Sequence, residues 1–66
     1  MTVTVNGQPR EVAHDCTLAE LLAALGYRAE GVAVAVDRQV VPRSELAHRR
    51  VRPGAEVEVL RAVGGG

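Results

Sequence analysis

A leucine-rich segment at residues 17–26, TLAELLAALG, constrains the fold more than any other part of the chain. Its leucines recur at the spacing i, i+3, i+4 and i+7, which places them on one face of a helix. These residues are Leu18, Leu21, Leu22 and Leu25. Thr17 and Glu20 match the capping box that pairs the free N–H groups at a helix start, and Gly26 stands where helices commonly end. The sequence predicts one amphipathic helix over residues 18–25, whose leucine face must be covered by a second layer.

The segment before this helix has the two-residue period of a β-strand. Residues 2–5 alternate threonine with valine, and this pattern is typical of a strand with one apolar face. Residues 6–9, NGQP, follow as turn residues, and Asn-Gly is a strong signal for a hairpin. We expect the chain to pair back over residues 10–13. The sequence therefore predicts an opening β-hairpin.

The segment after the helix returns to the period of a strand. Residues 32–36, VAVAV, place valines on one face and alanines on the other. A break at residues 37–39 separates this run from a short strand at Val40 and Val41. Pro42 has no N–H to donate, so we expect this pairing to end there or to lie at a sheet edge. The pattern predicts a long strand, a tight turn and a short strand.

The last third of the chain completes the order of elements. Residues 43–50 lack a sustained period and predict only a short helical turn, RPG at 52–54 is a turn signal, and residues 56–59 alternate charged with apolar residues as a last strand. This order predicts a two-layer α+β domain with a mixed sheet of four to five strands and one long helix on one face. With the last strand parallel to the first, it is the ubiquitin-like β-grasp arrangement. We expect the domain to span residues 1–63 and to end in a flexible glycine tail at 64–66.

Composition argues against several classes of function. Eight arginines, with no lysine, balance eight acidic residues, so the net charge gives no reason to expect a nucleic acid or an anionic membrane as partner. A single cysteine, Cys16, forms no internal disulfide, and with only His14 and His48 as further soft ligands it predicts no metal site. No apolar run approaches the roughly 20 residues that span a bilayer, and no secretion signal is visible. We expect a cytoplasmic protein.

The end of the chain combines a leucine that is out of phase with a run of small residues. Val57 and Val59 belong to the face assigned to the core, so Leu60 is expected on the opposite, exposed face. An exposed leucine there suggests a docking segment for a partner protein. The candidate docking residues are Leu60, Arg61, Ala62 and Val63, with Ala33 and Ala35 as a neighbouring small-residue surface. The alternative is that Leu60 is an ordinary exposed leucine or fills the far edge of the core.

The remaining reactive side chains favour structural interpretations. Cys16 resembles a small buried hydrophobic residue more than a persulfide relay. His14 and His48 are expected to be solvated, and the arginine run at residues 49–52 is expected to belong to a solvated loop, with an acidic or phosphate-bearing partner as the alternative. No catalytic residue is predicted.

Several motifs follow one another in a characteristic order along essentially the whole length of the chain. They are VNG at 5–7, TLAELLAAL at 17–25, VAVAVDRQVVPR at 32–43, PGAEVEVL at 53–60 and AVGGG at 62–66. Taken together and in order, these motifs resemble the ThiS family of sulfur carriers of thiamin biosynthesis. The fold that this resemblance implies is the β-grasp, in agreement with the order of strands and helix.

The resemblance implies that chemistry takes place on the C-terminal carboxylate of Gly66. In this family a ThiF-like adenylating and sulfurtransferase enzyme uses ATP and magnesium to adenylate that carboxylate. Sulfur from a cysteine-derived persulfide, supplied by a cysteine desulfurase or another source, then gives a thiocarboxylate, which donates its sulfur to a ThiG-like thiazole synthase. Gly64, Gly65 and Gly66 would thread the channel of the partner. The carrier itself would bind no cofactor or metal and would not be an enzyme.

Two alternatives stay open at this point. A molybdopterin-type or other thiocarboxylate carrier would use Gly66 in the same way. A β-grasp binding module without covalent chemistry would carry the three glycines only as the remainder of a linker. A carrier that must expose its tail is expected to be a monomer.

Overall fold

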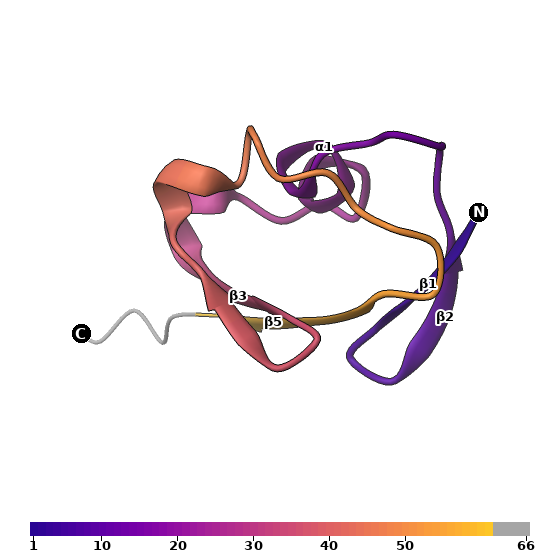
Figure 1. Ribbon diagram of the computed structural model, residues 1–66. Coiled ribbons are helices and arrows are strands. Elements are labelled where there is room, and N and C mark those ends of the chain that lie inside the picture. Colours follow the sequence, from indigo (N-terminus) through magenta and orange to yellow (C-terminus); the bar gives the residue numbers. More distant parts are fainter. Residues whose placement is uncertain (62–66) are drawn as a thin grey trace.

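A five-stranded mixed sheet covered on one face by a helix forms the two layers of the computed structural model, which describes residues 1–61 (Figure 1). The strands are β1 (Thr2–Val5), β2 (Gln8–Glu11), β3 (Val32–Val36), β4 (Gln39–Val41) and β5 (Glu56–Arg61). The helix α1 spans Leu18–Ala24, and two short 3₁₀ turns span η1 (Ala29–Gly31) and η2 (Arg43–Glu45). The predicted α+β class and the single helix on one face are confirmed.

The last strand lies in the middle of the sheet. The strand order is β2-β1-β5-β3-β4, with β5 parallel to β1 and antiparallel to β3. Both hairpins, β1 with β2 and β3 with β4, therefore meet only through β5. This is the ubiquitin-like β-grasp arrangement expected from the sequence. β5 is two residues longer than predicted, because β3 continues to pair with it as far as Arg61.

The first hairpin is tighter than the sequence analysis predicted. The second strand starts at Gln8 and ends at Glu11, not over residues 10–13. Asn6 and Gly7 both have positive φ, 51° and 82°, which suits a two-residue hairpin turn, so pairing resumes directly at Gln8. Pro9 is tolerated within β2 because β2 lies at the edge of the sheet, where the side that faces away from β1 pairs with no strand and needs no N–H donor.

Helix α1 begins and ends by the predicted signals. The Glu20 N–H donates to the Thr17 hydroxyl at 3.1 Å, and the Thr17 N–H donates to the Glu20 carboxylate at 2.8 Å, which completes the capping box. The helix ends at Ala24, one residue before the predicted end, and Leu25 is its C-cap. Gly26 follows with φ of 86°, the left-handed conformation that glycine adopts without strain.

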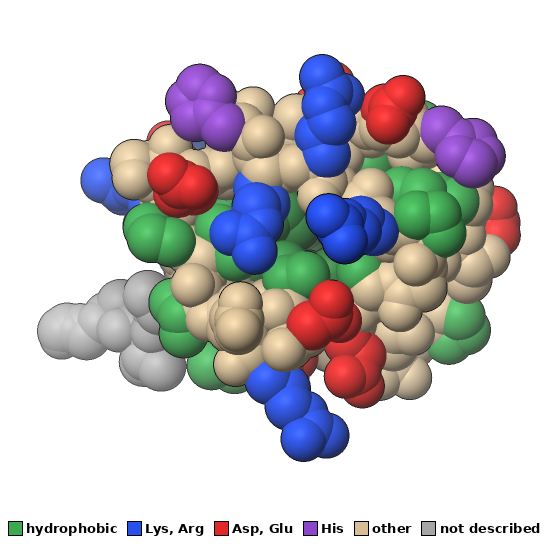
Figure 2. All heavy atoms as spheres, viewed as in Figure 1, with side chains coloured by type: hydrophobic (Ala, Val, Ile, Leu, Met, Phe, Trp, Pro, Cys, Tyr) green, Lys and Arg blue, Asp and Glu red, His purple; other side chains and the backbone are tan. Residues whose placement is uncertain are grey.

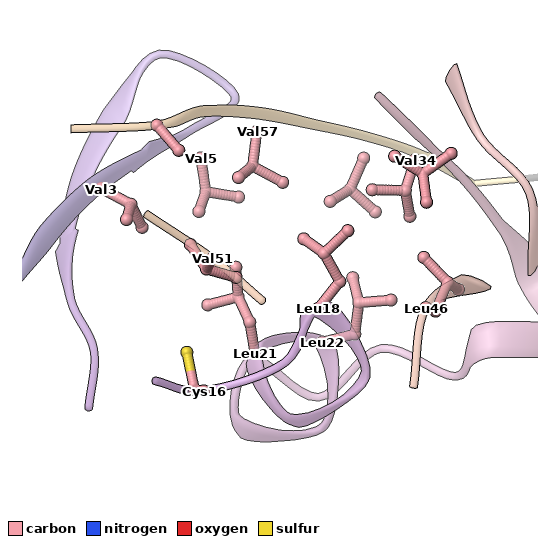
Figure 3. Packing of buried hydrophobic residues seen from close by; sticks show 13 residues of the cluster. Val3, Val5, Cys16, Leu18, Leu21, Leu22, Val34, Leu46, Val51 and Val57 are labelled. Atoms are coloured by element: carbon pink, nitrogen blue, oxygen red, sulfur yellow. The ribbon is translucent and has the colours of Figure 1, made fainter. Parts of the chain in front are cut away.

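The core lies between the helix and the inward face of the sheet (Figure 3). Three of the four predicted stripe leucines, Leu18, Leu21 and Leu22, are fully buried, and Leu25 is half-buried at the edge. They pack against inward valines of the strands and against three residues of the loop between β4 and β5, Leu46, Val51 and Ala55. The buried residues outside the helix include Val3, Val5, Val34, Val57, Val59, Leu46 and Val51. The loop that the sequence left without a period is thus attached to the core, with η2 as its only short helical turn within residues 43–50.

Candidate functional site

β5 ends at Arg61, directly before residues 62–66, which include the predicted glycine tail. Its last residue, Arg61, pairs with Val32 of β3, so the strand is held in the sheet up to the final described residue. The predicted tail residues Gly64, Gly65 and Gly66, the predicted docking residues Ala62 and Val63, and the predicted domain boundary all lie outside the described residues 1–61. The geometry of the site is therefore the geometry of the end of β5.

Asn6 holds β5 near its end from the side opposite β3. Backbone pairing of β1 with β5 reaches Val57, whose carbonyl accepts the Asn6 N–H at 2.9 Å. Two residues further along β5, beyond the end of β1, the Asn6 side chain takes over the role of the backbone partner. The Val59 N–H donates to the Asn6 Oδ1 at 2.8 Å, and the Asn6 Nδ2 donates to the Val59 carbonyl at 3.2 Å. β5 is thus fixed on both sides close to the tail.

Arg61 points to the helix side of the sheet. Because side chains alternate along β5, Arg61 lies on the same face as Val57 and Val59. Its guanidinium lies over the ring of Tyr27, with 5.4 Å between Cζ and the ring centroid. Tyr27 is itself placed by its N–H, which donates to the Leu22 carbonyl at 2.8 Å just after the helix. The two described docking candidates, Leu60 and Arg61, therefore lie on opposite faces of β5, and a partner that contacts both must enclose the end of the strand.

The face of the sheet opposite the helix carries an outer apolar patch, formed by Ala33, Ala35, Val40 and Leu60. Leu60 is 69% exposed and Val40 is 78% exposed, and they are the large hydrophobic residues most open to solvent within residues 1–61. Strand register brings them together, because Ala33 is opposite Leu60 and Ala35 is opposite Val40. A shallow groove of about 100 Å³ runs between these side chains. The predicted exposure of Leu60 and its place beside the two alanines are confirmed.

Val40 is the member of this patch that the sequence analysis missed. It precedes the buried Val41 in β4, and successive strand residues point to opposite faces. The phase argument that placed Leu60 outside applies equally to Val40. The signal was present, but two adjacent valines in a three-residue strand do not show which of them faces the core.

The other reactive side chains lie away from the end of β5. Cys16 is buried in the core, as expected of a small hydrophobic residue, while His14 and His48 are exposed. On the edge strand β2, a hydrogen bond from the Thr2 hydroxyl and then the Met1 amine at 3.7 Å lower the pKa of Glu11 below its usual value near 4.5. Among residues 1–61 no group of three His, Cys, Asp or Glu could hold a metal ion, and no helix there is long and apolar enough to cross a membrane.

A β-grasp domain whose central strand is held on both sides near its end, and whose sequence then closes with three glycines, has the architecture of the ubiquitin-like carriers. The ThiS family model matches residues 3–66, and the chain belongs to this family of sulfur carriers.

Relatives agree over the full length. The chain is 33% identical over 66 residues to the sulfur carrier protein ThiS of Escherichia coli (strain K12), and the match covers 100% of both. The crystal structure of ThiS from Geobacter metallireducens has a TM-score of 0.85 at 39% identity, with 100% of both chains covered. The solution structure of a thiamine biosynthesis protein from the same organism has a TM-score of 0.82 at 39% identity, and the match covers 100% of this chain and 88% of that one.

A thiazole synthase of Paramagnetospirillum magneticum (strain AMB-1) is also similar. It is 33% identical over the whole of this chain, but the match covers only 20% of that protein. A stretch similar to this chain is therefore part of a longer thiazole synthase. Membership of the ThiS family confirms the expected function, a sulfur carrier of thiamin biosynthesis that is not itself an enzyme.

Proposed function

We propose that the carboxylate of Gly66 is the group that carries the sulfur. The observation that carries this proposal is the fixed end of β5, which is paired with β3 at Arg61 and clasped by the Asn6 side chain at Val59. A strand held in this way fixes the position of Arg61, the residue that precedes residues 62–66. The family match extends to residue 66, so it includes the three glycines at residues 64–66.

The chemistry needs activation by a partner. An α-carboxyl group ordinarily has a pKa of about 3.5, so at neutral pH it is an anion and a poor electrophile. A ThiF-like enzyme, with ATP and magnesium, would join a Gly66 carboxylate oxygen to the α-phosphorus as pyrophosphate leaves. The terminal sulfur of an enzyme persulfide would then attack the carbonyl carbon as AMP leaves. A second thiol would cleave the S–S bond, which releases the thiocarboxylate and leaves a disulfide on the enzyme.

Ordering the tail has a cost that docking must offset. Fixing the backbones of the three final glycines costs about 3–6 kcal/mol. Burying a leucine or valine side chain contributes about 1.5–3 kcal/mol when it starts fully exposed. Leu60 and Val40 retain 69% and 78% of their exposure, so covering both offsets a large part of that cost. We therefore assign the outer apolar patch, with Arg61, Ala62 and Val63, to partner docking.

The proposed partners follow from the same sequence of reactions. The ThiF-like enzyme loads the tail, a cysteine desulfurase or another persulfide source supplies the sulfur, and a ThiG-like thiazole synthase consumes it. The similarity of the whole chain to part of a thiazole synthase supports the last of these partners. The carrier would bind no cofactor or metal of its own. We place it in the cytoplasm, where ATP and reduced thiols are present, and propose that it is a monomer when free.

Mass spectrometry of the intact protein tests the proposal. The chain would be expressed with its native C-terminus together with the ThiF-like enzyme from its own genome. We expect a species heavier by the exchange of one oxygen for sulfur, located on Gly66 by fragmentation. Deletion of Gly66, or addition of one alanine after it, should abolish this species. Addition of one alanine before Met1 is the matched control and should leave it unchanged.

Complementation separates the alternatives. The chain should restore growth without thiamin in a strain that lacks its thiamin sulfur carrier, and the Gly66 deletion should not. Rescue of only a strain lacking its molybdopterin carrier would place the chain in that pathway instead. Rescue of thiamin synthesis by the Gly66 deletion would show that the terminal carboxylate carries no sulfur and that the β-grasp domain acts by binding alone.

A further inference from the structure

A basic hollow lies at the opposite end of β5 from the tail. It encloses about 530 Å³ and lies between the turn after β3 and the loop before β5. Its lining residues are Val36, Asp37, His48, Arg49, Arg50, Arg52 and Ala55. Basic side chains gather near the middle of the face shown in Figure 2, over this loop. The role of the tail and the outer apolar patch leaves this hollow unexplained.

The charge in this region is concentrated and not balanced by ion pairs. Residues 43–52 hold four of the eight arginines and a single acidic residue, although the chain as a whole has no net charge. Within residues 1–61 the one ion pair joins the Met1 amine to Glu11, at the other edge of the sheet. Asp37 also lines the hollow and places one carboxylate against its three arginines, and its Oδ1 accepts the Glu56 N–H at 3.0 Å. The hollow therefore keeps an excess of positive charge.

The backbone that carries these arginines is held in place by the core. Val51, between Arg50 and Arg52, is buried, and its N–H donates to the Cys16 carbonyl at 2.9 Å. The Arg49 carbonyl accepts the Leu18 N–H at 2.9 Å, at the start of α1. The Arg50 side chain is fixed as well, because its Nη1 donates to the Asp15 carbonyl at 2.7 Å. A fixed backbone lowers the entropy lost when a ligand orders these side chains.

The distance along β5 determines what the hollow can contact. Ala55, in the hollow, and Arg61, at the base of the tail, are separated by about 20 Å of strand. The hollow and the end of β5 are therefore two separate regions of the carrier surface. A single partner that contacts both regions must reach across about 20 Å, as the contact face of a protein–protein interface does.

We propose that the basic hollow binds an acidic segment of the thiazole synthase partner, with Asp or Glu carboxylates seated against Arg49 and Arg52. The planar guanidinium matches a carboxylate with two parallel hydrogen bonds. The partner would then grip the carrier at both ends of β5, by charge at the hollow and by apolar contact near the tail. This inference rests on the proposed function for the identity of the partner.

Charge reversal within and outside the hollow tests the inference. We expect R49E and R52E each to weaken binding to the purified thiazole synthase about 10-fold, the effect of losing one charge-assisted contact. Binding would be measured by calorimetry at several salt concentrations, and both variants should show a shallower dependence on salt than the unmodified chain. R10E is the matched control, because it makes the same change of charge on the edge strand β2 and should bind within twofold of the unmodified chain.

Further measurements decide the remaining outcomes. Amide NMR spectra establish that each variant is folded, and R49Q provides a second variant of Arg49 without reversed charge. Equal affinity for R49E, R52E and R10E overturns the inference, as does an effect on binding to only the ThiF-like enzyme. Saturable amide shifts at residues 49–52 with millimolar inorganic phosphate also overturn it, in favour of a phosphate site. Thiocarboxylate formation at Gly66 in the unmodified chain is measured separately by mass spectrometry. A failure of the proposed function is thereby distinguished from a failure of this inference.

Discussion

On the helix side of the sheet, inward valines of β1, β3, β4 and β5 are buried in the core with the leucines of α1, whereas on the opposite side Val40 and Leu60 stay 78% and 69% exposed. The buried valines of these strands are Val3, Val5, Val34, Val41, Val57 and Val59. The two faces carry similar aliphatic side chains in the same strands. On the covered face this apolar surface stabilises the fold, and on the open face we propose that it contacts a partner. The predictions below test that division, in order of decreasing expected effect.

The covered face should govern stability. Leu21→Ala removes most of a fully buried side chain and should lower the free energy of unfolding by about 2–5 kcal/mol. That loss is comparable with the whole stability of a domain of this size, about 3–10 kcal/mol. Urea unfolding followed by circular dichroism measures it. Val40→Ala on the open face is the control and should cost less than about 0.5 kcal/mol. Equal costs at the two positions would remove the distinction between the faces.

The open face should govern partner affinity. Leu60→Asp places a charge in the outer apolar patch and should raise the KM of the ThiF-like enzyme for the carrier about 10-fold or more while kcat stays unchanged, since a desolvated anchor is lost from the complex. Gln39→Asp introduces the same carboxylate at an exposed β4 position outside the patch and is the control. A KM for Leu60→Asp equal to that of the control would show that this face does not dock.

The two hydrogen bonds between the Asn6 side chain and the Val59 backbone, here called the clasp, should determine how firmly the end of β5 is held. Asn6→Gly keeps the positive φ of the turn but removes both side-chain hydrogen bonds, so it should cost about 1–2 kcal/mol and speed hydrogen exchange of the Val59 amide. Asn6→Asp retains the acceptor for that amide and should protect it more than glycine does. Unchanged exchange in Asn6→Gly would mean that β3 alone holds the strand.

The smallest effect is expected at Glu11, at the far edge of the sheet. Its pKa is lowered in the folded state by the Thr2 hydroxyl and then by the Met1 amine, so the unfolded chain binds its proton more readily. This carboxylate therefore favours folding above its unfolded pKa, near 4.5, and the contribution is lost as the pH falls through the lower folded value. Glu11→Gln should flatten the acid limb of a plot of stability against pH. An identical acid limb in the two proteins would contradict this.

Local signals predicted the elements of this fold well, because each is complete within a few residues. The capping box of Thr17 with Glu20 and the glycine at position 26 set the limits of α1 to within one residue. The hairpin was misplaced by two residues because proline was taken as part of the turn, whereas an edge strand accepts Pro9 without losing a hydrogen bond. The ends of the strands depend on which strands pair with them, and the local sequence does not show these partners.

The site was predictable only where it follows strand phase. Leu60 was placed on the outer face by the alternation of β5, but the clasp joins Asn6 to a residue 53 positions away, and no local pattern signals it. The same holds for Arg61 over the Tyr27 ring, which brings the end of β5 to the segment after α1. It also holds for the basic hollow, which needs the loop before β5 to fold back on the start of α1. Long-range pairing created these features from residues that locally read as a turn, a helix end and a loop.

The central position of β5 also has a consequence for how the chain folds. Neither hairpin can complete its half of the core without this strand, and its pairing with β1 closes a loop of about 50 residues, which raises the contact order. We expect both halves to fold in one cooperative step that requires the C-terminal strand β5, so that neither half forms a stable domain alone. An enzyme that acts on Gly66, as proposed above, would then meet the completed end of β5 only on fully folded molecules, and the folding transition would determine which chains it loads.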